Sequence, residues 1–312
     1  MKRQAIMLPR EAIYYKYDPY LARFTPMVRQ ESCCNVMCDR LIRPLLAEFL
    51  AVVFSVFTVT LIEATLQDRK TDVIVSNCIV SVAESVCFLA FLLSFNRIHI
   101  NPAITMGCLF TANTPWYLCF LIFIIQVVGA TGGVLLHHLV TINQSPVIPR
   151  LITFDGETWL KGTYQLVMCQ TIATFTLVLC YLVVYPPIDN GHSGGAGGDV
   201  GGSRSRSAGT TYHALRDKDL PTNPAGLASA VMLASFLSHL NSTASWNPVK
   251  SLGISLAVSA RYSPDQVPSW QYHFIFWMGP VIGSLFASFL YRLVFADNDR
   301  RLSNCGRSEP DL

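Results

Sequence analysis

Charged residues are scarce in this sequence. Asp, Glu, Lys and Arg make up only 14% of its 312 residues, whereas hydrophobic residues make up 51%. A soluble domain carries about a quarter charged residues, so this chain has too few to cover a globule of its size. The composition argues against a soluble enzyme and indicates a protein that crosses a membrane several times. The net charge of only +3 gives no indication of a nucleic-acid-binding surface.

Signals for catalysis, metal binding and secretion are missing as well. The sequence contains no G-x-S-x-G motif, no HExxH motif and no CxxC pair. The glycine-rich run at 194–202 lacks the lysine, and the flanking strand and helix, of a phosphate-binding loop. No apolar segment precedes about residue 44, so we expect no cleaved signal peptide. We therefore expect neither an enzyme nor a metal or cofactor site.

Six apolar segments are candidates for transmembrane helices, which need about 20 residues each. The fifth is the weakest because it is short and rich in small residues. When the six are threaded in order, 17 of the 23 Lys and Arg lie on the side of the two termini and six on the other. This asymmetry predicts that both termini are cytoplasmic. The segments are residues 45–66, 73–95, 116–138, 164–186, 225–241 and 271–295.

Composition also divides the chain into regions. Residues 1–40 form a polar N-terminal segment and residues 296–312 a polar C-terminal tail, and both are expected in the cytoplasm. The apolar region between them covers residues 41–295. Within it, residues 187–224 are rich in Gly, Ser and charge. Such a stretch cannot build a core, so it predicts a flexible cytoplasmic loop.

Two shorter apolar segments begin with the dipeptide Asn-Pro, at Asn101 and at Asn247. Asn is a preferred N-cap residue, and Pro fits the first helical position because its missing N–H would be unpaired there. Each segment predicts a helix of about ten residues, enough for half a membrane. Each follows two spans and precedes a third, which indicates two repeats, about 41–140 and 160–295. Matched interrupted segments point to an inverted repeat with its site near the bilayer midplane.

These segments resemble the aquaporin, or major intrinsic protein, family. HINPAIT at 99–105 matches the family pattern H-x-N-P-A-x-T, and NPVKSLG at 247–253 is an altered form of N-P-A-R-S-x-G. AEFL at 47–50, TFTLVLC at 174–180 and the span at 274–295 are similar to the family's first, fourth and sixth helices. The resemblance implies an all-α membrane protein with six transmembrane helices and two re-entrant half-helices in an inverted repeat.

The resemblance also assigns pore residues. The two half-helices would meet with their positive ends together and, with two cap amides, pass neutral solutes in single file while excluding protons and ions. Lys250 stands where the family carries an arginine, so the charge is kept but the planar fork is lost. The assigned residues are Asn101, Pro102, Ala103, Asn247, Pro248 and Val249 for the caps, Lys250, Ala244, Ser81 and Ser235 for the selectivity filter, and His99, Glu48 and Gln170 for pore and loop support.

The function implied by the resemblance is a passive channel for water and other small neutral solutes, in a homotetramer of the plasma membrane, without a cofactor. Ser251 stands where glycerol-conducting relatives usually carry Asp, which favours the water-type branch. An alternative stays open, because Val249 and Lys250 depart from the motif and bulky Trp246 precedes it: a poorly conducting member with an adhesion, signalling or scaffolding role. Glu84, a carboxylate inside the second span, either serves function or is neutralised in the interior.

Overall fold

The computed structural model divides the chain into two units. One consists of residues 1–44 and 189–220, and the other of residues 45–188 and 221–312. The predicted loop at 187–224 lies outside the described residues as far as position 222. The structure describes residues 12–18, 23–29, 37–95, 97–141, 159–185, 223–242, 245–262, 270 and 273–296.

The first unit contains a β-hairpin that was not predicted from the sequence. Strand β1 (Ala12–Asp18) pairs antiparallel with strand β2 (Arg23–Arg29). Ala12 faces Arg29 at the open end, and Asp18 faces Arg23 next to the connection. Both strands carry β-branched or aromatic residues, which favour extended backbone. This polar segment has no long apolar run, so the apolar pattern of the sequence does not predict the hairpin.

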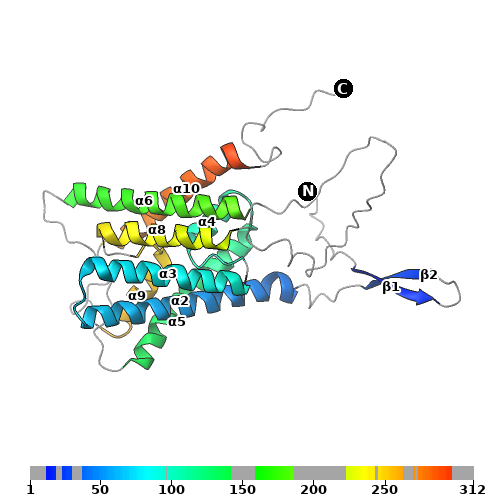
Figure 1. Cartoon of the computed structure of the whole chain (residues 1–312), viewed down its shortest axis with the longest axis horizontal. Coiled ribbons are helices and arrows are strands. Elements are labelled where there is room, and N and C mark those ends of the chain that lie inside the picture. Colours follow the sequence, from blue (N-terminus) through cyan, green and yellow to red (C-terminus); the bar gives the residue numbers. More distant parts are fainter. Residues whose placement is uncertain are drawn as a thin grey trace, which may run out of the picture. The chain divides into compact units, whose positions relative to one another are not determined.

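Six long helices account for the predicted spans (Figure 1). Five helices of the described residues are long and apolar enough to cross a membrane, whereas the fifth span is a shorter apolar helix over Pro224–Leu240. That is the span predicted to be weakest. The helices are α2 (Arg43–Asp68), α3 (Val73–Phe95), α5 (Trp116–Val140), α6 (Trp159–Val184), α8 (Pro224–Ser242) and α10 (Ile275–Leu290), with π-helical turns η1 (Cys38–Ile42) before α2 and η2 (Tyr291–Phe295) after α10.

Two half-helices begin at the Asn-Pro dipeptides. Helix α4 (Pro102–Phe110) is capped by Asn101, whose side-chain oxygen accepts from the backbone N–H of Ala103 at 2.8 Å. Helix α9 (Pro248–Ser259) is capped by Asn247, which accepts from the backbone N–H of Val249 at 3.2 Å. Both Asn residues have extended backbone, as N-caps do. The sequence therefore placed the start of each half-helix correctly.

Glycines mark the close approaches between long helices, and they do so in the same way in both repeats. A Cβ on Gly133 of α5 would lie 2.6 Å from the backbone oxygen of Val53 on α2. A Cβ on Gly283 of α10 would lie 2.6 Å from the backbone oxygen of Thr171 on α6. Small residues let helices in lipid approach this closely. Helix α5 therefore packs on α2 as α10 packs on α6.

Each half-helix packs against a long helix of the other repeat. A Cβ on Gly107 of α4 would lie 2.5 Å from the side chain of Val178 on α6. A Cβ on Gly253 of α9 would lie 2.7 Å from the backbone of Ala130 on α5. Helix α8 contacts both α3 and α6, between which it lies in Figure 1. The predicted fold of six long helices and two half-helices in mirrored repeats is confirmed.

Large apolar side chains point away from this bundle. Leu139 is 82% exposed and Trp116 is 74% exposed, and further exposed apolar residues lie along α2, α3, α6 and α10. In contrast, many buried residues are polar, among them Glu48, Gln126 and Asn101. Contiguous exposed apolar surface is unusual in a soluble protein. The distribution fits helices whose outer faces contact lipid and whose polar groups lie inside.

Candidate functional site

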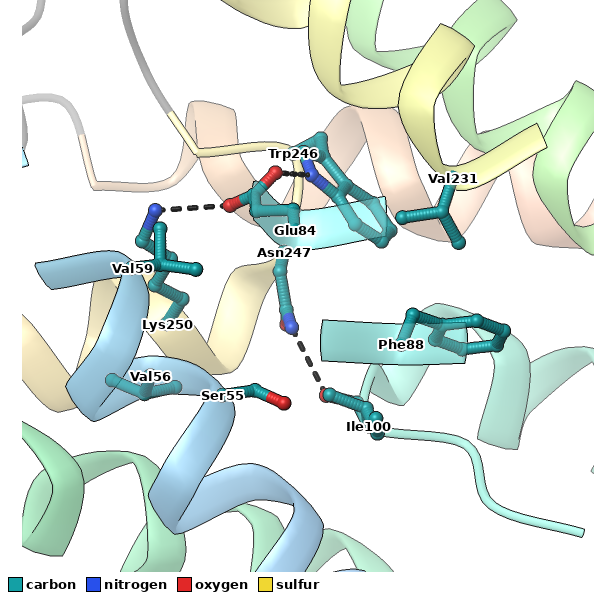
Figure 2. A pocket seen from close by; sticks show the side chains of 10 residues that line it. All are labelled: Ser55, Val56, Val59, Glu84, Phe88, Ile100, Val231, Trp246, Asn247 and Lys250. Carbon is teal, nitrogen blue, oxygen red and sulfur yellow. Dashed lines mark hydrogen bonds and ion pairs between the residues drawn. The ribbon is translucent and has the colours of Figure 1, made fainter. Parts of the chain in front are cut away.

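The two half-helices begin next to one another. The side-chain amide of Asn247 donates to the backbone oxygen of Ile100 at 3.0 Å, and Ile100 immediately precedes the cap Asn101 (Figure 2). Both helices start at this place, so their positive ends and unpaired N–H groups are brought together. Pro102, Pro248 and the residues that follow them form the first turns and are buried.

The two cap amides differ in what they contact. Asn101 is 1% exposed, and its Nδ2 has no hydrogen-bond partner in the described part of the chain. The Nδ2 of Asn247 already donates to Ile100. Both amides were expected to donate to a passing solute. In this geometry one of the two N–H bonds of the Asn247 amide links the two pore loops.

Glu48 on α2 holds the loop that leads into α4. Its carboxylate accepts hydrogen bonds from the backbone N–H of His99 at 2.9 Å, from the backbone N–H of Ile100 at 2.5 Å and from Nε2 of Gln126 at 2.7 Å. Ile100 has a φ of +58°, a region that β-branched residues rarely adopt. Three donors on one buried carboxylate thus hold this strained loop in place.

His99 lies within the same loop and packs on the second repeat. Its Nδ1 is 3.0 Å from Oγ1 of Thr105, and its ring meets Tyr181 of α6 edge to face with centroids 5.7 Å apart. His99 is buried, and it is not among the residues that line the cavity described below. Its contacts fit the predicted support of the loop, whereas the predicted contact with the pore remains a prediction.

By the family resemblance, Gln170 on α6 is expected to be the second-repeat counterpart of Glu48. It donates from Nε2 to Oγ of Ser238 on α8 at 2.6 Å, and its Oε1 has no partner among the residues that the structure describes. Its predicted support of the second pore loop stays a prediction. In the structure it acts as a donor between α6 and α8.

A small cavity adjoins the caps. Its volume of about 30 Å³ holds one or two water molecules, since a water needs about 10–15 Å³ of such space. Its polar groups come from Ser55, Glu84, Asn247 and Lys250, and the remaining wall is largely apolar. Figure 2 shows the ten side chains around it, which are Ser55, Val56, Val59, Glu84, Phe88, Ile100, Val231, Trp246, Asn247 and Lys250.

The ammonium group of Lys250 is paired with two carboxylates. Its Nζ lies 2.6 Å from Oε1 of Glu63 on α2 and 3.0 Å from Oε1 of Glu84 on α3. Lys250 is 3% exposed, and Glu84 is 8% exposed. A buried charge requires such partners. The cation at the predicted filter position is therefore neutralised within the protein, and it ties α9 to α2 and α3.

Glu84 is the centre of this arrangement. Its Oε2 accepts from Nε1 of Trp246 (Figure 2) and from Oγ of Ser235 at 2.5 Å. Ser235 Oγ also lies 3.1 Å from Oγ of Ser81. His239 Nε2 is 3.9 Å from the same Oε2. Of the two interpretations of Glu84, these contacts favour a carboxylate paired inside the protein.

The predicted filter residues are partly brought together. Lys250, Ser81 and Ser235 all lie around Glu84, whereas Ala244 is outside the described residues. Glu63 and His239 were missed. We call Glu63, Glu84, His239 and Lys250 the charged cluster. Glu63 and His239 carried a usable signal, because an ionisable residue inside a membrane span indicates function by default.

The chain is similar to known membrane proteins over most of its length. A family model described as Major intrinsic protein matches residues 36–201 and 208–291. Aquaporin C of Dictyostelium discoideum is 24% identical over 290 residues, which are 89% of this chain and 92% of that protein. Probable aquaporin PIP2-5 of Arabidopsis thaliana is 27% identical over 218 residues, or 69% of this chain and 64% of that protein. Neurogenic protein big brain of Drosophila melanogaster is 23% identical over 217 residues, or 69% of this chain and 24% of that protein. The match thus spans less than two thirds of the length of the last two relatives.

Proposed function

The chain belongs to the major intrinsic protein family of multi-pass membrane channels, and on that premise we propose that it conducts water and other small neutral solutes passively. The observation that carries this proposal is the meeting of two capped half-helices beside a small cavity. No group in the proposed mechanism changes covalently. A solute moves down its own gradient or the osmotic gradient.

The caps supply the selectivity against charge. Each half-helix presents roughly half a positive charge at its N-terminus, so the midpoint repels cations. The cap amides donate to a solute oxygen, and a water held in this way points its own hydrogens away from the caps. A proton relay needs the opposite orientation on one side. We therefore assign exclusion of protons and cations to the midpoint.

The charged cluster does not contribute to the exclusion of cations in the same way as the caps. An unpaired cation beside the pore would repel cations, but here one ammonium faces two carboxylates. The cluster thus adds no barrier to cations, and exclusion rests on the caps alone. The side chains of Glu84, Trp246 and Lys250 leave a cavity of about 30 Å³. We propose that these bulky side chains favour water over larger solutes such as glycerol or urea.

The proposal extends to location and assembly. We place the protein in the plasma membrane as a homotetramer, with each subunit holding its own pore and both termini in the cytoplasm. The bias of Lys and Arg supports this orientation. The exposed apolar faces of the long helices provide surface for subunit contacts as well as for lipid. The domain boundaries at residues 40 and 296 belong to the same proposal.

The test is a solute panel in proteoliposomes. Full-length protein is reconstituted, and water efflux is followed by stopped-flow light scattering beside uptake of urea, glycerol, ammonia and hydrogen peroxide. Wild type is compared with Lys250→Arg and Val249→Ala, which restore the family motif one residue at a time. We expect water permeability above that of protein-free liposomes and no proton leak. Background permeability for every solute overturns the proposal.

A second candidate function is a poorly conducting family member with an adhesion, signalling or scaffolding role. The observation that favours it is the linkage of Lys250, Glu84 and Trp246, which crosses from α9 to α3 beside a very small cavity. A relative of this chain is named a neurogenic protein. Aggregation of non-adherent cells that express the chain, together with background permeability in liposomes, supports this candidate over the channel.

A further inference from the structure

We propose that the charged cluster is a binding site for a transition-metal dication of the Zn²⁺ class. The ligands are one carboxylate oxygen each from Glu63 and Glu84 and an imidazole nitrogen from His239. These three ligand atoms lie within 4.8 Å of one another. The inference goes beyond the proposed function, because metal binding to the protein does not depend on whether any solute passes.

His239 provides the observation that points to a ligand. Its side chain is buried, with 4% of the residue exposed, and its Nε2 has no hydrogen-bond partner among the described residues. Nε2 lies 3.9 Å from Oε2 of Glu84, too far for a hydrogen bond. Buried polar atoms in native proteins are nearly always partnered. A metal ion between the imidazole and the two carboxylates supplies the missing partner.

The donor set selects the class of metal. One imidazole nitrogen and two carboxylate oxygens suit Zn²⁺ and its borderline neighbours, which accept nitrogen ligands at about 2.0–2.2 Å and leave a fourth position for water. Mg²⁺ and Ca²⁺ prefer an all-oxygen shell with six or more ligands. A single histidine among two carboxylates therefore favours the transition metal.

Neighbouring groups hold the ligands in place. Trp246 and Ser235 both donate to Oε2 of Glu84, which fixes the orientation of its carboxylate. Nδ2 of Asn77 donates to the backbone oxygen of His239 at 3.1 Å and so joins α3 to α8 at this level. Such supporting hydrogen bonds around metal ligands affect affinity by 10–100-fold. The three ligands come from three different helices, so metal binding also clamps α2, α3 and α8.

Lys250 competes with the metal. Its ammonium lies against both carboxylates, at 2.6 Å from Glu63 and 3.0 Å from Glu84, and neutralises them when no metal is bound. A dication that takes the carboxylates displaces this ammonium. Because Lys250 and Glu84 also line the cavity, metal binding changes the cavity wall. Because of this competition, removal of the Lys250 ammonium should tighten metal binding.

The test is isothermal titration of the purified full-length protein in detergent with ZnCl₂, with MgCl₂ titrated in parallel. We expect one zinc site and magnesium binding at least 100-fold weaker. His239→Gln weakens zinc binding at least tenfold, and Lys250→Met tightens it at least tenfold. His138→Gln is the matched control, since it removes a histidine from α5 outside the cluster, and it leaves zinc binding unchanged. Zinc binding that neither His239→Gln nor Lys250→Met alters overturns the proposal.

Two further readouts keep the test decisive. The visible spectrum with Co²⁺ distinguishes the proposed nitrogen and oxygen ligands from cysteine, because thiolate ligands add intense charge-transfer absorption. A thiolate spectrum assigns the metal to cysteines and contradicts the cluster. If His239→Gln fails to fold, the melting temperatures of wild type and Lys250→Met are compared with and without Zn²⁺. The proposal then requires that Zn²⁺ raise the melting temperature of Lys250→Met more than that of wild type. None of these readouts uses transport, so a failed solute panel and a failed metal site are told apart.

Discussion

The two repeats share one packing scheme but hold their pore loops differently. In the first repeat the carboxylate of Glu48 accepts three hydrogen bonds and fixes the loop before α4. In the second repeat Gln170 makes one hydrogen bond to Ser238 and none to the loop before α9 among the described contacts. The ionisable groups near α9 instead form the charged cluster. The first repeat uses a buried charge to brace its own loop, whereas the cluster beside α9 combines Glu63 and Glu84 of the first repeat with His239 and Lys250 of the second.

The two cap residues also differ in how they depend on the other repeat. Ile100 is held by Glu48, and its backbone oxygen in turn accepts from the amide of Asn247. The second cap therefore depends on the loop of the first repeat, whereas Asn101 does not depend on the second in the same way. We infer an order of support that runs from Glu48 to Ile100 to Asn247. Loss of the Glu48 carboxylate should accordingly have larger consequences than the equivalent change at Gln170.

The largest effect is expected at Glu48. Glu48→Met keeps the size of the side chain but leaves two backbone N–H groups without their acceptor and removes one of the two acceptors of Gln126 Nε2. Each buried donor left without a partner costs about 1–3 kcal/mol, so the loss in unfolding free energy should reach several kcal/mol. The matched change Gln170→Met removes a single hydrogen bond and costs about 1 kcal/mol. Reversible unfolding in mixed micelles, followed by circular dichroism, measures both. Equal losses at the two positions would show that the repeats are braced alike.

A smaller effect on stability is expected at the glycines within the half-helices, Gly107 of α4 and Gly253 of α9. A Cβ at Gly253 meets the backbone of Ala130, which cannot move aside, so Gly253→Ala should cost about 1–3 kcal/mol. A Cβ at Gly107 meets the side chain of Val178, which can shift, so Gly107→Ala should cost less. Gly132→Ala is the control, because its nearest neighbour is 3.9 Å away. The same unfolding measurement ranks the three. A greater loss at Gly107 than at Gly253 contradicts the contact geometry.

The fold was largely predictable because it is encoded in local patterns. Apolar length located the long helices, and the Asn-Pro dipeptides located Pro102 and Pro248 as the first residues of the half-helices. The hairpin of β1 and β2 was missed, because the N-terminal segment was assessed only by its polarity. Secondary structure in such a segment depends on strand pairing, which a search for apolar runs does not detect.

The site was predictable only in part because its contacts join distant positions. Lys250 was identified from its motif, but its partners Glu63 and Glu84 lie 187 and 166 positions away in the sequence. Packing decides which helices contact each other, and local sequence patterns do not predict these contacts. The link from Asn247 to Ile100, across 147 positions, was hidden for the same reason. Ionisable residues inside spans were visible, but their grouping into one cluster was not.

The smallest effect distinguishes the two caps. Serine is also a good N-cap, so Asn101→Ser and Asn247→Ser both keep the capping of their helices and remove only the amide donor. Asn247→Ser loses the hydrogen bond to Ile100 and should cost about 1 kcal/mol of unfolding free energy. Asn101→Ser breaks no protein hydrogen bond at Nδ2, so its stability should change by less than about 0.5 kcal/mol.

Permeability should respond in the opposite order. Among the described residues Asn101 uses neither N–H bond of its amide for a protein contact, whereas Asn247 uses one, so Asn101→Ser should alter water permeability and proton exclusion in proteoliposomes more than Asn247→Ser does. Unfolding and stopped-flow measurements on the same two variants separate the roles. If Asn247→Ser changed permeability more and stability less than Asn101→Ser, the second cap would be the solute-binding one. The order of support from Glu48 through Ile100 would then have to be reversed.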